Sequence, residues 1–381
     1  MEPLAAYREI TDGLRRPVRV TELVYAAAQR AGSGLPTRAE IDGERSLLQK
    51  DKRGLEIAQG EFVARILADE QCGAHLVHSM TRPTAAALAQ LDEFRRSGSA
   101  DLGPFRVDRD GRVGIVTNQN HACLNAEDDA STAAMEVAVD LALLDDAIEV
   151  GVLRGAPAIH PKYAGRRILG AGINLTALYR GQISLLEFMI DRELGAVHKM
   201  FRGHPLGAVG DGDLEERREK PWIAAVESFA IGGACQWLLV MDRVISERDA
   251  YINLPARKEG IIPGCANLRL PRLVGEHATR NAIFFNRAFT ASEPTGRLIA
   301  DELVDGESDM DAAIARDAAE LISAGATSLV ANRRQLRIAA EPLPVFRRYM
   351  AGYAREQSRC LYAPALIDNL ERNWNAHQRA V

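Results

Sequence analysis

The sequence contains little cysteine, and its cysteines do not form a scaffold pattern. Its 381 residues include five cysteines and no CxxC pair, and an odd, scattered set suits reduced thiols better than a disulfide framework. The apolar runs, such as 133–144, are short or interrupted by Glu and Asp, and the first residues lack a signal-peptide pattern. We therefore expect a soluble, cytoplasmic protein with no membrane partner.

An excess of positive charge is also missing. The formal net charge is -5, which gives no general attraction for nucleic acid or anionic lipid. A polyanionic ligand would need a local basic patch. Lys162, Arg166 and Arg167 form one such cluster, although a solvated run of charges explains them about as well. We expect no nucleic-acid partner.

Cofactor and metal motifs are absent too. The cluster GAGINL at 170–175 lacks the last glycine of GxGxxG, and AIGGAC at 230–235 lacks the GKS or GKT ending of a phosphate loop. Cys72, His75 and His78 would share a helical face, but no fourth ligand is nearby. We expect structural roles for these three residues, and neither a metal site nor a flavin or nicotinamide cofactor.

The hydrophobic pattern divides the chain into three parts. Apolar residues recur at helical spacing from Val18 to Arg96, and the small, polar run 95–102 is typical of a linker. From Arg112, short β-branched strands alternate with amphipathic helices, which predicts a parallel α/β sheet. Helical spacing returns from 310 to 374. We expect a helical N-terminal region (1–102), a core (103–309) and a C-terminal helical region (310–381).

Four segments between Gly111 and about Asp305 resemble the crotonase (enoyl-CoA hydratase/isomerase) superfamily, in chain order. They are VGIVTNQNHACLNAED, RRILGAGINL, VESFAIGGACQWLLVMD and INLPARKEGIIPGCANLRLPRLVG. The resemblance implies an α/β fold, the crotonase (ClpP-like) spiral of ββα units, between a helical N-terminal region and a helical C-terminal part. It also implies a homotrimer or homohexamer.

The same resemblance implies an oxyanion hole. The α-proton of a thioester can be removed when preorganised donors hold the developing enolate oxygen, and each donor contributes about 3 kcal/mol. By resemblance these donors are the backbone N–H groups of Ile173, which follows Ala171 and Gly172, and of Gly233. Glycine suits such a site because the backbone approaches the ligand closely.

Two departures argue against water addition. Typical hydratases carry one glutamate three residues after the oxyanion glycine and another directly after the proline of an LPE-like segment. This sequence has Gln236 and Ala256 there, and neither an amide nor a methyl group exchanges protons near neutral pH. Asn174 also stands where many relatives have Asp.

A more specific resemblance is to the cofactor-independent dioxygenases of glycopeptide-antibiotic pathways. It rests on the helical N-terminal extension and on HPKY, GAGINL and GGACQW. It implies that O2 oxidises an arylacetyl-CoA at its α-carbon, giving an aryl glyoxylate and free CoA. Both O2 and the acyl-CoA are then substrates, with no metal, haem or flavin.

The resemblance also gives roles to individual residues. Glu127 and Arg192 match positions that recognise phenolic hydroxyls and support charge, and Gln236 one that contacts substrate or an oxygen intermediate. The alternatives that do not use the resemblance are a solvent-facing Glu127, a surface Arg192 and, for Gln236, a helix-interior amide that is satisfied by the backbone. The expected acyl-CoA contacts are His121, His160, Pro161, Lys162, Tyr163, Ala171, Gly172, Asn174 and Leu175.

Other functions stay open. An isomerase, thioesterase or decarboxylase of the same superfamily is one alternative, and a non-catalytic acyl-CoA-binding scaffold is another. The acceptor of the α-proton is also open, between Glu127, a bound water and a species derived from O2.

Overall fold

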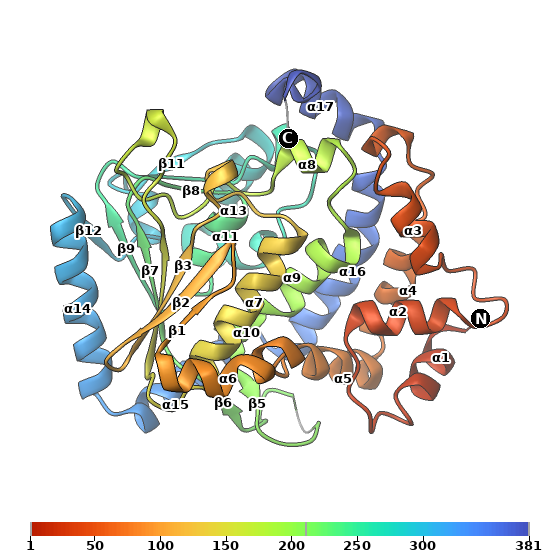
Figure 1. The fold of residues 1–381 in the computed structure, drawn as a ribbon, viewed down its shortest axis with the longest axis horizontal. Coiled ribbons are helices and arrows are strands. Elements are labelled where there is room, and N and C mark those ends of the chain that lie inside the picture. The colour runs from red at the N-terminus through yellow and green to blue at the C-terminus, as the bar shows by residue number, and fades with distance from the viewer. Residues whose placement is uncertain (1, 210–211, 380–381) are drawn as a thin grey trace.

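The computed structural model describes residues 2–209 and 212–379. Its centre is a sheet in the order β1-β2-β3-β4-β7-β9-β12 (Figure 1). The strands from β3 to β12 pair in parallel, and β1 and β2 extend the sheet antiparallel. The expected parallel α/β sheet is therefore confirmed. The strands are β1 (Ser99–Asp101), β2 (Phe105–Asp110), β3 (Val113–Asn118), β4 (Val150–Gly155), β7 (Trp222–Val226), β9 (Arg243–Glu247) and β12 (Glu302–Val304).

Side chains alternate between the two faces of this sheet because successive strand residues point in opposite directions. In β4, Val150 and Val152 pack against α14 (Glu307–Ser323) on the outer face. Leu153 faces the larger core beneath α7 (Asp129–Leu144) and α10 (Ala196–Arg202). Both faces are covered, as a parallel sheet requires.

Two smaller sheets complete the strand structure. One has the order β11-β10-β8 and the other pairs β5 with β6. Their strands are β5 (His204–Pro205), β6 (Arg217–Arg218), β8 (Phe229–Ile231), β10 (Tyr251–Asn253) and β11 (Phe289–Thr290). The remaining helices of the core are η2 (His121–Cys123), η3 (Pro161–Tyr163), α8 (Leu175–Tyr179), η4 (Leu185–Ile190), α9 (Asp191–Leu194), α11 (Gly233–Leu238), α12 (Ala256–Glu259), α13 (Ala266–Phe285) and η5 (Gly296–Leu298).

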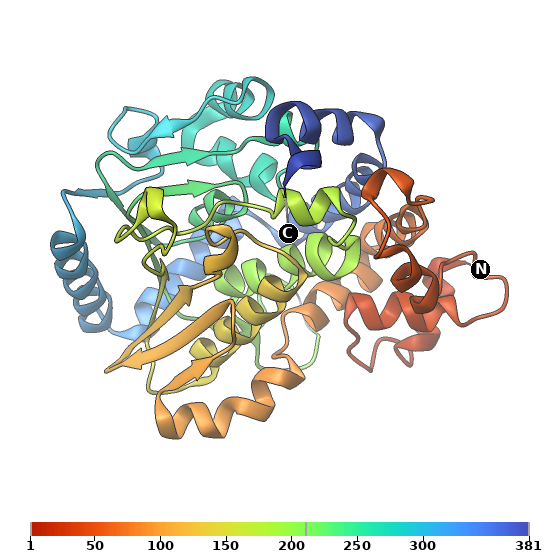
Figure 2. The ribbon, with the colours of Figure 1, turned by 45° about the horizontal axis from the view of Figure 1, so that its top comes forward.

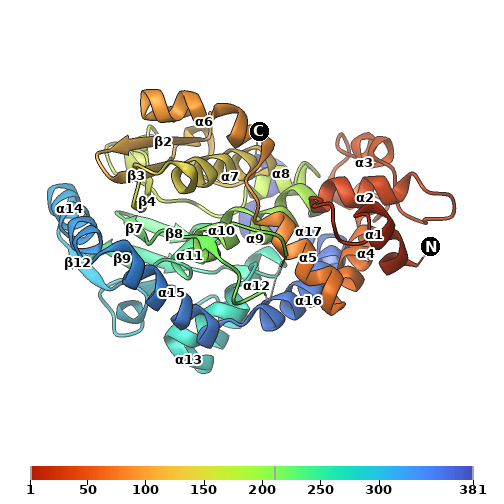
Figure 3. The same ribbon diagram turned by 90° about the horizontal axis from the view of Figure 1, so that it is seen from below.

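The helices within residues 3–80 and 343–374 lie together on one side of the sheet (Figures 1 and 3). α16 packs along α4 and α5, and side chains of both regions share one core with residues of the segment 173–194. The terminal helices are α1 (Pro3–Ile10), α2 (Val20–Ala28), α3 (Arg38–Glu44), η1 (Gln49–Asp51), α4 (Glu56–Ala68), α5 (Glu70–Met80), α6 (Ala85–Ser97), α15 (Ala326–Ala340), α16 (Leu343–Leu361), α17 (Pro364–Trp374) and η6 (Ala376–Gln378).

The prediction of a linker at 95–102 is wrong. α6 continues to Ser97, and Ser99–Asp101 forms strand β1 against β2. The small and polar residues of this segment predicted a linker. The same composition also suits an edge strand, because the outward groups of such a strand are exposed to solvent. The division at 102 and 309 stays a prediction, and the helical N-terminal region shares its core with distant parts of the chain rather than packing by itself.

Candidate active site

Two asparagines fix the turn that leads into the site. Asn118 ends β3, and its amide donates to the carbonyls of Asn125 (3.0 Å) and Leu169 (3.1 Å). The Asn125 amide donates in return to the carbonyls of Asn118 (2.9 Å) and Ile168 (2.7 Å). Both side chains are buried. The pair therefore ties the turn before Glu127 to residues 168 and 169, which precede the predicted oxyanion loop.

The two glycine clusters meet backbone to backbone. A β-carbon on Gly172 would lie 3.2 Å from the Ile231 carbonyl oxygen, and one on Gly232 would lie 3.1 Å from the Gly172 α-carbon. Both glycines also have positive φ angles, +81° and +54°, which other residues rarely adopt. Side chains at either position would push the two loops apart.

The predicted oxyanion donors lie on these two loops. Glu127 N–H donates to the Gly172 carbonyl and Asn174 N–H to the Glu127 carbonyl, each at 2.7 Å. The N–H of Ile173, between them, and that of Gly233 have no hydrogen-bond partner within residues 2–209 and 212–379. Since buried backbone donors are almost always paired, these two are available to a ligand.

Glu127 and Arg192 form a buried ion pair beside Gly233. Arg192 Nε donates to Glu127 Oε2 at 2.6 Å, and its Nη2 donates to the Gly233 carbonyl at 2.8 Å. The two residues are 2% and 3% exposed, so the alternative of a solvent-facing Glu and a surface Arg is wrong. Burial raises the pKa of Glu127, and the Arg192 guanidinium counteracts part of that rise.

Arg192 also connects two further side chains. Its Nη1 donates to Gln236 Oε1 at 2.9 Å and to the carboxylate of Glu193. Burial alone would lower the pKa of Arg192, but Glu127 and Glu193 outweigh it and raise that pKa. The guanidinium therefore stays charged. Gln236 is held by Arg192 rather than by the backbone of its own helix.

These residues line one cavity, together with the segment that precedes α13. Gly264 lies so close that a β-carbon there would meet Gln236 Oε1 at 2.3 Å and Glu193 Oε1 at 2.4 Å. Glu259, at the end of α12, adds a third carboxylate to the lining. The other lining residues are Ile173, Phe188, Met189, Gly232, Ile261, Ile262, Pro263 and Tyr353.

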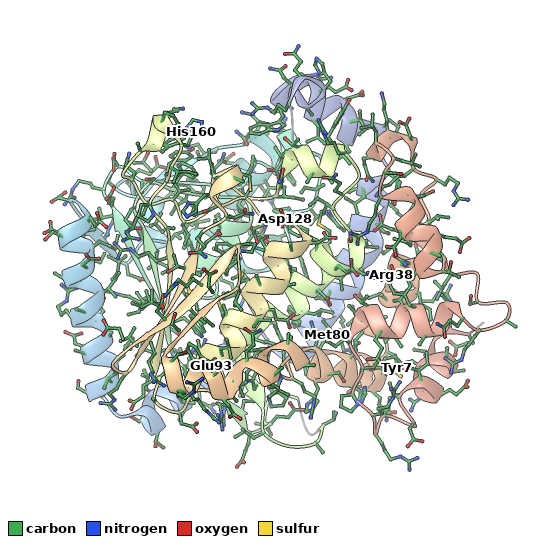
Figure 4. All side chains as sticks on the ribbon, in the orientation of Figure 1. Tyr7, Arg38, Met80, Glu93, Asp128 and His160 are labelled. Carbon is green, nitrogen blue, oxygen red and sulfur yellow. The ribbon has the colours of Figure 1, made fainter. Side chains whose placement is uncertain are left out.

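The structure does not bring the predicted acyl-CoA contacts into this cavity. His160, Pro161 and Lys162 are exposed on the loop between β4 and the oxyanion loop, and His160 stands at its tip, well apart from Asp128 (Figure 4). Tyr163 packs edge-on against Phe229, with ring centroids 5.5 Å apart. The acyl-CoA role of this outer loop stays a prediction.

The remaining predicted contacts lie beside the oxyanion loop. His121 is half-buried in η2, in the turn that precedes Glu127. Ala171 is half-buried next to Gly172. Asn174 caps α8 by accepting the Ala177 N–H at 3.0 Å, and Leu175 begins that helix. Their contacts with acyl-CoA also stay predictions.

The basic cluster in the outer loop is largely paired with acidic groups. Arg166 contacts Glu247 at 2.9 Å, and Arg167 contacts Glu307 at 2.8 Å. Lys162 instead lies over the Tyr163 ring, 5.0 Å from its centroid. Of the three basic residues proposed from the sequence, Lys162 is the one that makes no ion pair with the described residues.

Several site residues were missed in the sequence. No local signal identifies Asn118, Asn125 or Glu193. Their hydrogen-bond partners are either distant in the chain or are neighbours that form no recognisable motif with them. Glu259 is different, because it lies one helical turn after Ala256, the position where hydratases carry a glutamate.

The two histidines of the candidate metal cluster have different side-chain partners, which lie in different parts of the chain. His75 Nδ1 lies 2.6 Å from the Tyr7 hydroxyl, and His78 Nδ1 lies 3.2 Å from Glu215. Within residues 2–209 and 212–379, no three His, Cys, Asp or Glu side chains gather as metal ligands would.

In the same part of the chain, none of the helices combines the length and apolar character needed to cross a bilayer.

Comparison with known proteins places this chain in a family. It is 46% identical to the (3,5-dihydroxyphenyl)acetyl-CoA 1,2-dioxygenase of Amycolatopsis orientalis over 362 residues, which span 95% of this chain and 82% of that protein. The chain belongs to this dioxygenase family. The family's wider relationship is also visible, since residues 215–350 match the enoyl-CoA hydratase/isomerase model.

More distant relatives show the extent of the shared fold. A probable enoyl-CoA hydratase of Rhizobium meliloti is 26% identical over 188 residues, 49% of this chain and 63% of that protein. Among solved structures, Pseudomonas aeruginosa OdaA has a TM-score of 0.59 at 19% identity, covering 73% of this chain and all of that one. An enoyl-CoA hydratase of Bacillus halodurans has a TM-score of 0.57 at 18% identity, covering 71% and 99%. The expected crotonase fold is therefore confirmed.

Proposed function

We propose that this chain is a dioxygenase that converts 3,5-dihydroxyphenylacetyl-CoA and O2 to 3,5-dihydroxyphenylglyoxylate and CoA. The relative from Amycolatopsis orientalis supports the substrate and the reaction. The structural observation that carries the proposal is the pair of N–H groups of Ile173 and Gly233, which lie beside one cavity and have no partner among the described residues. Such donors stabilise the oxyanion of an enolate.

The chemistry balances without a further reagent. Removal of one α-proton gives a carbanion that is delocalised over the ring and the thioester, and this carbanion is the reductant for O2. Both oxygen atoms of O2 then enter the glyoxylate, whose third oxygen comes from the thioester carbonyl. The sulfur leaves as CoA thiol, and one proton goes to solvent.

The polar side chains of the cavity suit this substrate. Glu127 and Arg192 offer an acceptor and donors within one buried ion pair, and a phenolic hydroxyl binds both kinds of group. Gln236 stands at the position where a hydratase needs an acidic side chain, and its Oε1 atom accepts a hydrogen bond from Arg192. The site therefore favours enolate stabilisation over water activation.

Three finer features belong to the proposal. O2 and the acyl-CoA act as substrates without a resident metal, haem or flavin. The protein works in the cytoplasm, in glycopeptide-antibiotic biosynthesis. It assembles as a homotrimer or homohexamer, as crotonase-fold enzymes commonly do.

The test is O2 consumption by metal-stripped protein given 3,5-dihydroxyphenylacetyl-CoA, with mass analysis of the products under air and under argon. Oxygen uptake with equimolar glyoxylate and CoA is expected. Release of CoA under argon would instead indicate a thioesterase, and an isomerised or decarboxylated thioester would indicate another crotonase activity. Tight binding without any product would indicate a scaffold.

A further inference from the structure

Glu259 is a buried carboxylate that has no partner in the described part of the chain. It ends helix α12 and is 6% exposed. Within residues 2–209 and 212–379, its side chain makes neither a hydrogen bond nor an ion pair. Buried acidic side chains are normally paired, so an unpaired one carries a cost in stability. A functional role explains why the chain accepts that cost.

The position of Glu259 points to the reaction centre. Its side chain lines the same cavity as Ile173 and Gly233, whose N–H groups are free to bind the thioester oxygen. The two other carboxylates of that lining, Glu127 and Glu193, accept hydrogen bonds from Arg192. Glu259 is thus the carboxylate of the described lining whose oxygens are both free to accept a proton.

The backbone around Glu259 is firmly supported. Its N–H donates to the Pro255 carbonyl at 3.1 Å, and the next N–H, of Gly260, donates to Ala256 at 2.8 Å. A β-carbon on Gly260 would lie 3.2 Å from the α-carbon of Leu366, so α17 packs directly against this turn. Figures 2 and 3 show α17 beside the segment that carries α12. A base that acts on carbon needs such fixed support.

We propose that Glu259 is the general base that removes the α-proton of the acyl-CoA. The step rests on the proposed dioxygenase function. One Glu259 oxygen forms a bond to the α-proton, and the C–H electron pair becomes the C=C bond of the enolate. The carbonyl π electrons move to the thioester oxygen, which the N–H groups of Ile173 and Gly233 bind.

The acidity of the group fits this task. Burial raises the pKa of Glu259 to about 7, and a base is most effective when its pKa lies near the working pH. The charged groups that share its cavity are Arg192, Glu127 and Glu193, with the phenol of Tyr353 on α16. Glu259 also lies three residues after Ala256, so both side chains share one face of α12. Relative to the hydratase glutamate at the position of Ala256, this carboxylate lies one helical turn further along the chain.

The experiment measures proton removal separately from oxidation. Under argon in D2O, deuterium uptake at the α-carbon of 3,5-dihydroxyphenylacetyl-CoA reports carbanion formation, and O2 consumption under air reports complete turnover. The variants are Glu259→Gln, Glu259→Asp and, as a matched control, Glu356→Gln at an exposed position on α16. Tightness of substrate binding is measured for each.

For Glu259→Gln we expect deuterium uptake and kcat to fall by about 100-fold or more, with substrate binding within a few-fold of wild type. Glu259→Asp keeps a carboxylate, so it should retain intermediate activity and a pH inflection, which a purely structural role would not produce. Glu356→Gln should behave as wild type.

Two results separate this proposal from the one on which it rests. If wild-type protein turns over and Glu259→Gln exchanges and oxidises at the same rate with the same pH profile, Glu259 is not the base and the dioxygenase function stands. If Glu259→Gln does not fold, an unchanged rate and pH profile in Glu259→Asp overturns the proposal. If wild-type protein neither exchanges the proton nor consumes O2, the dioxygenase function itself fails.

Discussion

The Glu127 carboxylate occupies the space where a side chain of Gly233 would be. A β-carbon on Gly233 would lie 1.6 Å from Glu127 Oε1 and 2.7 Å from Arg192 Nη2. One residue thus supplies a predicted oxyanion N–H and leaves room for the ion pair that lines the cavity. The absence of a side chain at Gly233 therefore matters for two parts of the site at once.

This relationship predicts that Gly233→Ala abolishes most turnover. The new methyl group would displace Glu127 and move the Gly233 N–H, and loss of one oxyanion donor costs about 100-fold or more in kcat. Gly233→Val should be worse. The control is Gly352→Ala on α16, where a β-carbon meets nothing within 4 Å. Full O2 uptake by Gly233→Val would sink the oxyanion assignment.

A second prediction concerns the stability that Arg192 provides. Arg192→Ala leaves Glu127 and Glu193 buried without their shared cation, and breaking a buried ion pair in this way costs about 3–5 kcal/mol. The measurement is the free energy of unfolding in denaturant. The comparison is Arg359→Ala, which breaks a largely exposed contact with Glu61 and should cost less than about 1 kcal/mol. Equal losses in the two variants would contradict the prediction.

A third prediction is a pH dependence of stability due to Glu259. Burial raises its pKa from 4.5 to about 7, so between these values the unfolded chain gives up this proton and the folded chain keeps it. The free energy of unfolding therefore falls as the pH rises through this window, by up to about 3 kcal/mol from this group.

Glu259→Gln has no such proton to lose. We expect this variant to be more stable than wild type at about pH 8, and the difference to disappear at about pH 4, where Glu259 is protonated in both states. Thermal unfolding across the pH range measures this difference. A variant that is less stable than wild type at about pH 8 would show that Glu259 is paired in the folded protein.

A fourth prediction is that Gln236→Glu combined with Ala256→Glu does not create a hydratase. The oxygen of residue 236 accepts from Arg192 Nη1 at 2.9 Å, so a glutamate there becomes a partner of a guanidinium that stays charged. Pairing of this kind favours the ionised form and weakens the carboxyl as an acid. The assay is loss of the conjugated double bond of crotonyl-CoA, and measurable hydration would show that the lost carboxylates alone set the reaction.

Local sequence determined several parts of this protein. The alternation of β-branched strands and helices indicated the parallel sheet, because side chains alternate in strands and recur every three to four residues in helices. The glycine clusters indicated where two loops approach closely, since only glycine permits that contact. Residues 173 and 233 were singled out within these clusters by the resemblance to the crotonase superfamily.

The tertiary structure decided the rest, because ionisable groups acquire their chemistry from neighbours that are distant in the chain. Arg192 joins Glu127, 65 positions earlier, to Gln236, 44 positions later, and no sequence spacing encodes that arrangement. The same holds for the two asparagines that fix the turn. Glu259 is an ordinary helix residue in the sequence, and only its burial in the cavity, with no partner among the described residues, raises its pKa to about 7.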